Sequence, residues 1–287
     1  MRATAAIAVI AAAGIFAADG PSSATPSQPP RFRHVIVVMF ENHGVSQVLQ
    51  DPAAPTFRHL AERYATLANY DALAHPSLPN YLALVAGSTF GLDTDCTRCV
   101  IDAPNLADTL PARSLTWKTY VEDIPRKLDH ITDPGVKARI PFLYFRDVLS
   151  SRRRMHDIVP LADFSRDLRA DRLPSFSLVI PDLCHDMHDC SVATGDRWLE
   201  SFMDPLLRAG ELRRSVVFIT FDEAERPDDR GGGGQVPAIV VGPGVRPDSV
   251  SSVPLNHYSL LRTIEDAWKV RLLGLSATAQ PVTGIWR

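Results

Sequence analysis

Hydrophobic and polar positions alternate along this chain in a way that predicts an α/β fold. Continuous apolar, β-branched runs are typical of strands that are buried on both faces of a parallel sheet. Segments between these runs repeat apolar residues at helical spacing. The expected strands cover residues 34–40, 115–121, 175–180, 215–221 and 236–241, and the expected helices cover 56–67, 161–170, 195–207 and 257–268. The alternation predicts a largely parallel central sheet sandwiched by helices.

Residues 75–88 combine a helix start with a serine that can carry chemistry. Ser77 occupies an expected N-cap position, and Gly87 ends the apolar helix that follows. The Ser77 hydroxyl can cap this helix, which contributes about 1 kcal/mol. Alternatively, it can act beside an anion such as phosphate, which the free N–H groups and the dipole of the first turn attract. The segment alone leaves both roles open.

The N-terminus is typical of a secretory signal peptide, because Arg2 precedes an almost wholly apolar, alanine-rich run. The run is short for a membrane span of about 20 residues, so we expect cleavage and no stable membrane span afterwards. We predict a signal peptide over residues 1–19, a disordered lead-in over 20–31 and a single domain over 32–287. The mature protein is then secreted or periplasmic.

Composition narrows the partners and the redox setting. A net charge of −3 argues against nucleic acid as the main partner. Four cysteines in an exported chain suggest disulfides, Cys96 with Cys99 and Cys184 with Cys190, although four cysteines allow three connectivities. Zinc binding by the same cysteines is the alternative. The sequence does not predict the oligomeric state.

Acidic residues follow three of the expected buried strands. Glu41 and Asn42 follow the first, Asp182 follows the run at 175–180, and Asp222 with Glu223 follows the run at 215–221. The carboxyl ends of parallel strands share one edge of the sheet, where ligands bind, so these acids should converge. Clustered carboxylates repel unless a cation neutralises them. The pattern therefore predicts a divalent metal site.

A metal at this edge gives Ser77 a chemical use. A serine hydroxyl is a weak nucleophile unless a base or a metal ion stabilises its alkoxide. An oxygen-rich site of Glu41, Asn42, Asp222 and Glu223 can do this, and in-line attack on a phosphoryl group then gives a phosphoserine. Oxygen ligands suit Mg, Ca or Mn, whereas added histidines favour Zn or Fe. The metal and its count stay open.

Several motifs together resemble those of a known family. They are Val-Ile-Val-Val-Met-Phe-Glu-Asn at 35–42, His-Pro-Ser-Leu-Pro-Asn-Tyr-Leu-Ala-Leu at 75–84, Asp-Met-His-Asp at 186–189, Gly-Asp-x-Trp-Leu at 195–199, Asp-Glu at 222–223 and Asn-His-Tyr-Ser-Leu-Leu at 256–261. The chain resembles the phosphoesterase family of acid phosphatases and bacterial phospholipases C, within the alkaline phosphatase superfamily. In particular it is similar to short secreted acid phosphatases that act on phosphatidylinositol 3-phosphate.

The resemblance implies an alkaline phosphatase-like fold and roles for individual residues. Ser77 corresponds to the metal-bound nucleophile, and Glu41, Asn42, Asp222 and Glu223 correspond to ligands of its metal. Other matching positions near the site can hold a second metal, protonate the leaving group or bind phosphate; these are His75, Asp186, His188 and His257. Ala138-Arg139 stands where relatives carry Lys-His before the aromatic segment at Pro141-Phe142, and Arg139 is a further candidate for phosphate binding.

The expected function is a metal-dependent phosphomonoesterase with a serine nucleophile, whose substrates include phosphate monoesters and phospholipid headgroups such as phosphatidylinositol 3-phosphate. The alternatives are a phospholipase C-type phosphodiesterase and an exported, metal-stabilised binding module. A sulfatase is disfavoured, because sulfatases carry Arg four residues after the modified residue, where this chain has Tyr81.

Overall fold

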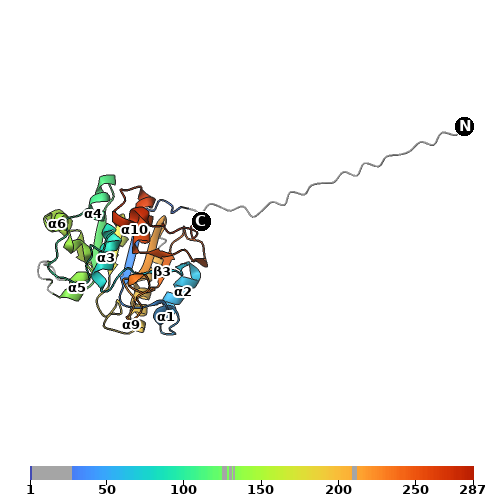
Figure 1. Cartoon of the computed structure of the whole chain (residues 1–287), viewed down its shortest axis with the longest axis horizontal. Coiled ribbons are helices and arrows are strands. Elements are labelled where there is room, and N and C mark those ends of the chain that lie inside the picture. Colours follow the sequence, from blue (N-terminus) through green and yellow to red (C-terminus); the bar gives the residue numbers. More distant parts are fainter. Residues whose placement is uncertain (2–27, 125–127, 129–130, 132, 209–211) are drawn as a thin grey trace.

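The computed structural model describes residue 1 and residues 28–124, 128, 131, 133–208 and 212–287. The predicted signal peptide and most of the predicted lead-in lie outside these described residues. The described chain forms an eight-stranded mixed sheet with helices packed against it (Figure 1). The sheet order is β5-β4-β6-β1-β7-β8-β2-β9, and a second, two-stranded sheet joins β10 to β3.

The central strands are the continuous apolar runs of the sequence. Strands β1, β6 and β7 are buried along their whole length, and β1 lies between the other two in parallel register, with Val37 opposite both Leu178 and Phe218. The strands are β1 His34–Phe40, β2 Ala65–Leu67, β3 Tyr70–Asp71, β4 Trp117–Val121, β5 Ile158–Pro160, β6 Phe176–Ile180, β7 Ser215–Phe221, β8 Ala238–Val241, β9 Ser249–Ser251 and β10 Leu255–Asn256. The predicted largely parallel sheet is confirmed, with β8 antiparallel to both β7 and β2.

The helices fill the connections between these strands. The α-helices are α1 Val45–Leu49, α2 Pro55–Arg63, α3 Ser77–Ala86, α4 Leu106–Thr109, α5 Pro134–Ala138, α6 Arg146–Leu149, α7 Arg152–Met155, α8 Ala162–Arg169, α9 Val192–Arg208 and α10 His257–Trp268. Short 3-10 turns cover Pro111–Arg113, Pro141–Tyr144, Arg230–Gly232 and Gly274–Thr278. Helices α3 and α10 pack side by side in front of the strands in Figure 1, and α2 packs against α9.

One expected helix ends early, and a strand takes the place of its last residues. The helix expected over 56–67 ends at Arg63, and β2 follows it as a short strand between β8 and β9. Tyr64 breaks the helix with backbone angles of φ −119° and ψ −123°. The apolar positions of this run therefore belong to a helix up to Arg63 and to a strand from Ala65, and hydrophobic periodicity does not mark this change.

The sequence over residues 122–160 has an irregular pattern that predicts an excursion from the sheet, and the structure there is more regular than this pattern suggests. It contains α5, α6 and α7 and returns to the sheet as β5, which pairs with β4. Six of its residues, within 125–132, lie outside the described part of the chain. Its helix α5 ends beside Arg139, whose side chain reaches toward the loop after β6.

Helix α3 starts one residue earlier than a Ser77 cap requires. Its N-cap is Pro76, so Ser77 is the first helical residue and its hydroxyl does not have the capping role expected from the sequence. The predicted end is confirmed, because Gly87 has φ +70° and a β-carbon there would lie 1.9 Å from the carbonyl oxygen of Leu273. Only glycine meets both conditions. The hydroxyl of Ser77 is thus free for contacts outside the helix cap.

Glu265 in α10 is a buried acid outside the candidate site, and it predicts a pH dependence of stability. Its carboxylate accepts hydrogen bonds from the Leu273 backbone N–H (2.9 Å) and the Ser276 hydroxyl (2.6 Å). Burial nevertheless raises the pKa of Glu265 to about 8 from 4.5. A raised acid pKa means that the folded protein binds this proton more tightly than the unfolded chain. The stabilisation is complete below pH 4.5 and is lost as pH rises to about 8.

We therefore expect Glu265→Gln to flatten the fall in unfolding free energy between about pH 5 and pH 8, by at most about 1.4 kcal/mol per pH unit. Urea unfolding at several pH values measures this slope. Glu200→Gln, at an exposed position of α9, is the matched control and should leave the slope unchanged. An identical slope in Glu265→Gln and wild type would contradict the assignment.

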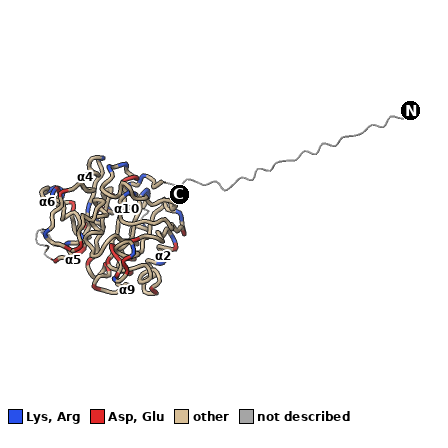
Figure 2. Tube along the Cα trace, in the orientation of Figure 1, with Lys and Arg blue, Asp and Glu red and all other residues tan. Residues whose placement is uncertain are grey.

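The described surface carries charges of both signs. Figure 2 shows basic and acidic residues interspersed around the domain. None of the helices in the described ranges combines the length and apolar character that a bilayer span requires.

Candidate active site

Four neighbouring parallel strands each end in an acidic residue at the same edge of the sheet. In sheet order, Glu122 follows β4, Asp182 lies two residues after β6, Glu41 follows β1 and Asp222 follows β7. Backbone hydrogen bonds continue past the strand ends, from Glu41 N to Asp186 O (2.9 Å) and from Asp222 N to Phe40 O (3.0 Å). These bonds fix the backbone where the acids emerge. The sheet therefore places the acids along one edge, as expected for a ligand-binding edge.

Ser77 faces the acids of the two central strands. Its Oγ donates to Glu41 Oε2 at 3.1 Å and lies 3.5 Å from Glu223 Oε1. The side chains of Ser77, Glu41 and Glu223 are all buried, with less than a tenth of each residue exposed. The first turn of α3 thus brings its hydroxyl to the carboxylates that follow β1 and β7.

Asp222 supplies an oxygen with no partner in the described chain. Its Oδ1 accepts the Asn42 backbone N–H at 3.2 Å, whereas its Oδ2 is buried and accepts no hydrogen bond from the described residues. An unpaired buried carboxylate oxygen is costly unless a cation neutralises it. The donor set of Asp222, Glu41, Glu223 and Ser77 therefore fits a divalent cation with oxygen ligands.

The pKa values of these acids follow the same electrostatics. Burial raises the pKa of Glu41, and burial together with the nearby Glu41 and Glu223 raises that of Asp222 well above its ordinary value. Burial also raises the pKa of Glu223 to about 7, against the opposing effect of His75. A site that disfavours negative charge in this way favours either protons or a cation.

Tyr81 holds Glu41 from the other side, and the sequence analysis did not assign it this role. Its hydroxyl donates to Glu41 Oε1 at 2.5 Å, and both residues are buried. Tyr81 lies four residues after Ser77, so one face of α3 carries both residues that contact Glu41. A tyrosine one helical turn after a candidate nucleophile is the sequence signal that could have identified it.

We expect Tyr81→Phe to weaken binding of a divalent cation about 10-fold or more, because the orientation of Glu41 depends on this hydroxyl. Isothermal titration with Mn²⁺ measures the affinity. Tyr64→Phe, at a half-buried position whose hydroxyl has no hydrogen bond to the described residues, is the control. Unchanged affinity in Tyr81→Phe would show that Glu41 is held without it.

His75 orients Glu223. Its Nε2 lies 2.9 Å from the Asp228 carbonyl oxygen, which can only accept, so Nε2 carries a hydrogen. Its Nδ1 contacts Glu223 Oε2. Both ring nitrogens are therefore engaged, and the imidazole fixes one of the acids that face Ser77.

His257 is fully buried beneath the site. Its Nε2 donates to the Asp222 carbonyl oxygen (2.8 Å), and its Nδ1 accepts from the Tyr70 hydroxyl (3.1 Å). Burial lowers the pKa of His257 to about 4, so the ring is neutral. It supports the backbone of Asp222, and neither nitrogen is turned to the cavity.

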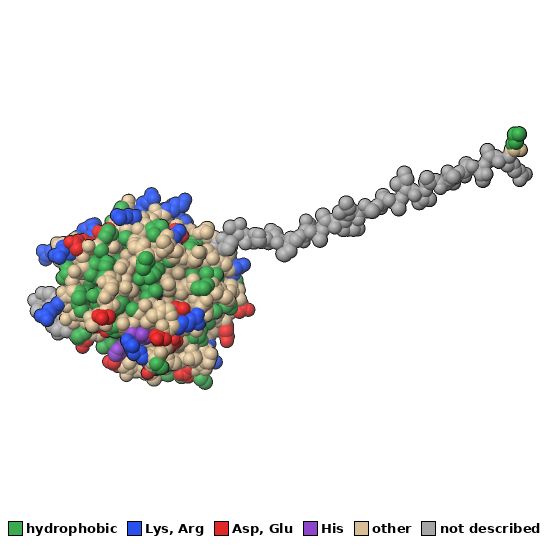
Figure 3. All heavy atoms as spheres, viewed as in Figure 1, with side chains coloured by type: hydrophobic (Ala, Val, Ile, Leu, Met, Phe, Trp, Pro, Cys, Tyr) green, Lys and Arg blue, Asp and Glu red, His purple; other side chains and the backbone are tan. Residues whose placement is uncertain are grey.

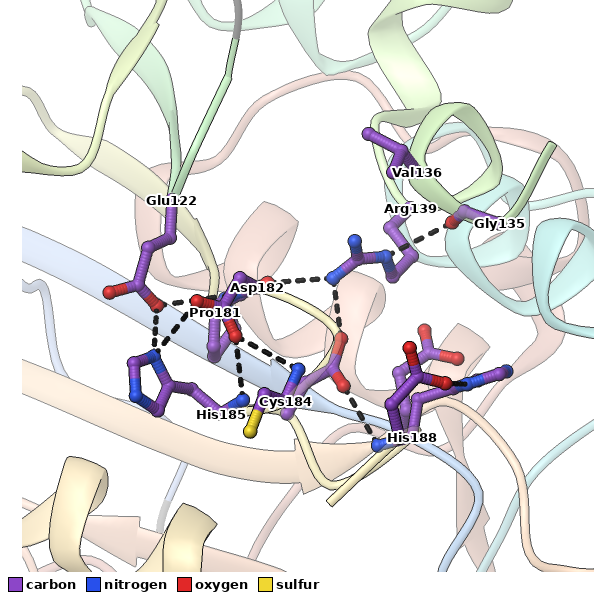
Figure 4. Close-up of polar contacts among 12 residues, drawn as sticks. Glu122, Gly135, Val136, Arg139, Pro181, Asp182, Cys184, His185 and His188 are labelled. Atoms are coloured by element: carbon purple, nitrogen blue, oxygen red, sulfur yellow. Dashed lines mark hydrogen bonds and ion pairs between the residues drawn. The ribbon is translucent and has the colours of Figure 1, made fainter. Parts of the chain in front are cut away.

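Arg139 and Asp186 form a buried ion pair between two parts of this edge (Figure 4). Arg139 also donates to the carbonyl oxygens of Pro181 (2.6 Å) and Gly135 (3.0 Å). The other oxygen of Asp186 accepts the His188 backbone N–H at 2.9 Å. Arg139 and Asp186 therefore fix the loop that carries His188.

An open cavity of about 430 Å³ lies over this arrangement. Its lining residues include Asn42, His75, His188, Glu223 and Arg226. Histidine side chains gather beside acidic and basic ones on the lower part of the face shown in Figure 3. Of the four residues whose role the sequence left open, His75 and His188 line the cavity, and His188 is the more exposed.

The structure groups Asp182 with Glu122, apart from the acids that follow β1 and β7. Among the described residues, the His and carboxylate group whose ligand atoms all lie within 4.8 Å of one another consists of Glu122, Asp182 and His185. From the sequence we expected Asp182 to lie beside Glu41 and Asp222 in one metal site. Glu122 was not among the predicted site residues. Both expected disulfides are present, Cys96–Cys99 and Cys184–Cys190, which leaves no cysteine free as a zinc ligand.

Comparison with known proteins extends these findings. A model of the phosphoesterase family matches residues 44–271. A phosphatidylinositol-3-phosphatase of Mycobacterium tuberculosis is 33% identical over 262 residues, which cover 90% of this chain and 84% of that protein. A probable acid phosphatase of Kluyveromyces lactis is 30% identical over 258 residues, covering 85% of this chain and 60% of that longer protein. The chain thus spans less than two thirds of the fungal relative.

Solved structures share the fold at low sequence identity. A protein in the alkaline phosphatase superfamily from Vibrio parahaemolyticus has a TM-score of 0.60 at 14% identity, covering 89% of this chain and 71% of that chain. A phosphonate monoester hydrolase from Silicibacter pomeroyi has a TM-score of 0.54 at 14% identity, covering 88% and 78%. The chain therefore shares the α/β fold of these solved structures, one of which is described as a protein in the alkaline phosphatase superfamily.

The chain belongs to the phosphoesterase family. It is a hydrolase that acts on phosphoric esters, and its relatives include acid phosphatases. The resemblance and the fold expected from the motifs are confirmed. The exported binding module, considered above as a non-enzyme alternative, is set aside.

Proposed function

We propose that this protein is a metal-dependent phosphomonoesterase in which Ser77 is the nucleophile. One observation carries the proposal: Ser77 Oγ lies 3.1 Å from Glu41 Oε2 and 3.5 Å from Glu223 Oε1, beside Asp222 with its unpartnered buried oxygen. A serine hydroxyl is a weak nucleophile on its own, and this arrangement supplies both a carboxylate that can accept its proton and acidic ligands for a cation that would stabilise its alkoxide. The phosphatases among the relatives support the same reaction class.

The residues that would hold the cation are Glu41, Asn42, Asp222 and Glu223, together with Ser77. When bound, a divalent cation supplies stabilisation of the serine alkoxide and withdraws charge from a phosphoryl oxygen. Glu41 Oε2 already accepts the hydroxyl of Ser77, so it is the first acceptor for the proton that Ser77 loses. His75 and Tyr81 keep Glu223 and Glu41 in place for this task.

The reaction then proceeds in two displacements. Ser77 Oγ forms a bond to phosphorus as the bond from phosphorus to the ester oxygen breaks, and the departing alcohol takes up a proton. Water then attacks the phosphoserine, the bond from phosphorus to Ser77 Oγ breaks, and the serine regains its proton. His188 lines the cavity, and its Nδ1 contacts Asp189 Oδ1 at 2.7 Å. We assign His188 one of two roles: it donates a proton to the departing alcohol, or it binds a phosphate oxygen of the substrate.

We further propose that the substrates include a phosphoinositide headgroup. The support is the phosphatidylinositol-3-phosphatase that is 33% identical over most of this chain. Secretion or periplasmic export is proposed from the apolar N-terminal run and the two disulfides. N-terminal sequencing of the exported protein tests cleavage near residue 19.

Hydrolysis of an aryl phosphate monoester beside its diester tests the proposed function. Purified mature protein with added Mn²⁺, Mg²⁺ or Zn²⁺ should hydrolyse the monoester at least about 10-fold faster than the diester, and a chelator should abolish both rates. Faster diester hydrolysis would favour the phospholipase C-type alternative. Vesicles that contain phosphatidylinositol 3-phosphate, compared with vesicles without it, then test the lipid headgroup as a substrate.

A further inference from the structure

We propose a second cation site, formed by Glu122, Asp182 and His185, which takes a divalent transition-metal ion such as Zn²⁺. The three residues come from the end of β4, the end of β6 and the loop that the Cys184–Cys190 disulfide closes. Figure 4 shows their side chains turned toward one another. This inference does not rest on the proposed phosphatase mechanism.

The ligand atoms have the spacing of a small coordination sphere. His185 Nδ1 lies 2.9 Å from Glu122 Oε2 and 3.1 Å from Asp182 Oδ2. Bonds of about 2.0–2.2 Å from zinc to nitrogen or oxygen place tetrahedral ligand atoms roughly 3.3–3.6 Å apart. A shift of a few tenths of an ångström therefore admits the ion. The imidazole nitrogen favours Zn²⁺ over Ca²⁺, which prefers oxygen ligands only.

The surrounding contacts orient the ligands before an ion binds. Asp182 Oδ1 accepts the backbone N–H groups of Cys184 (2.9 Å) and His185 (2.7 Å), so its Oδ2 is left to face the site. The ring of His185 stacks on Trp198 at a centroid distance of 6.4 Å. Outer contacts that fix ligand orientation are typical of metal sites.

Charge and access both favour a cation. Of the ion pairs between described residues, Glu122 and Asp182 take part only in those with His185. One imidazole, which carries at most one positive charge, cannot neutralise two carboxylates. The three side chains keep about a fifth to a third of their surface exposed (22% for Glu122 and Asp182, 36% for His185), so an ion can enter and water can complete its coordination.

The site is distinct from the Ser77 cluster, because Glu122 and Asp182 follow β4 and β6, whereas Glu41 and Glu223, which Ser77 contacts, follow β1 and β7. The proposed cation site lies at one end of the loop that carries Asp186 and His188. An ion bound at Glu122, Asp182 and His185 would therefore stabilise this loop, which also carries His188 of the candidate catalytic cavity.

Zinc stoichiometry tests the proposal. Wild type, His185→Ala, Glu122→Gln and His59→Ala are dialysed against micromolar Zn²⁺, and bound zinc per chain is measured by elemental analysis. His59 is an exposed histidine of α2 and serves as the matched control. We expect His185→Ala and Glu122→Gln each to bind one equivalent fewer than wild type and His59→Ala. The same comparison in a Ser77→Ala background removes any effect of turnover.

Equal amounts of bound zinc per chain in all four proteins would overturn the proposal. The three residues would then form only the ion pairs of His185 with Glu122 and Asp182. If His185→Ala does not fold, Glu122→Gln decides alone, because it keeps the shape of the side chain. If the wild-type protein showed no phosphatase activity, the expected difference in bound zinc between wild type and the site variants would still stand. Failure of the proposed function and failure of this site are therefore distinguishable.

Discussion

Ser77→Ala is expected to lower kcat for a phosphate monoester by about 10³-fold or more while the protein stays folded. The hydroxyl is directed to Glu41 and Glu223 and is not the cap of α3, so its loss removes the nucleophile without removing a capping bond. Steady-state kinetics at saturating Mn²⁺ measure the effect. Thermal unfolding checks that the fold is retained.

Ser46→Ala, at an exposed position of α1, is the matched control for this experiment and should keep wild-type kcat. If metal-replete Ser77→Ala turned over substrate at the wild-type rate, another group would have to attack phosphorus. The geometry around Ser77 would then describe a metal site without a serine nucleophile.

Asp222→Asn is expected to have two opposite effects. It removes one negative charge from the buried acidic cluster, in which Asp222 Oδ2 has no partner in the described chain. The metal-free protein should therefore become more stable. It also removes a ligand, so affinity for Mn²⁺ and the monoester rate should each fall about 10²-fold or more. Thermal unfolding with and without Mn²⁺, together with calorimetric titration, measures both effects.

Asp204→Asn, on the exposed side of α9, is the control and should change neither quantity. The informative pattern is a higher unfolding temperature without metal and a smaller rise when metal is added. A variant that is destabilised without metal, yet binds Mn²⁺ normally, would show that Asp222 has a structural role instead.

The buried strands could be predicted because their sequences leave few alternatives. The runs that form β1 and β7 consist mostly of apolar residues, many of them β-branched, and the structure assigns them the expected bounds, His34–Phe40 and Ser215–Phe221. Strand β2 could not be predicted, because three residues after a helix carry no periodicity of their own. Pairing with β8 and β9 decides its conformation.

The site was partly predictable for a similar reason. Acids at strand exits mark the binding edge, but the order of strands in the sheet is a tertiary property. Because β6 lies between β4 and β1, Asp182 is grouped with Glu122 and His185, while the exits of β1 and β7 face Ser77. No local sequence pattern predicts that these acids divide into two groups.

Side-chain direction accounts for the remaining differences. His257 opens a helix, which suggests an exposed or capping role, yet its ring is buried between Tyr70 and the backbone of Asp222. Tyr81 belongs to an apolar helix, and its hydroxyl becomes informative only once Glu41 is seen beside it. Such contacts join residues more than thirty positions apart in the chain.

Identification of the residue that becomes phosphorylated during turnover is the most direct test of the central claim. Protein mixed with an excess of aryl phosphate monoester and Mn²⁺ is quenched in acid within the first turnovers, and its peptides are analysed by mass spectrometry. The account predicts phosphate on Ser77 in wild type and none in Ser77→Ala. Phosphate on His75 or another residue, or unlabelled Ser77 together with full turnover by Ser77→Ala, would contradict it.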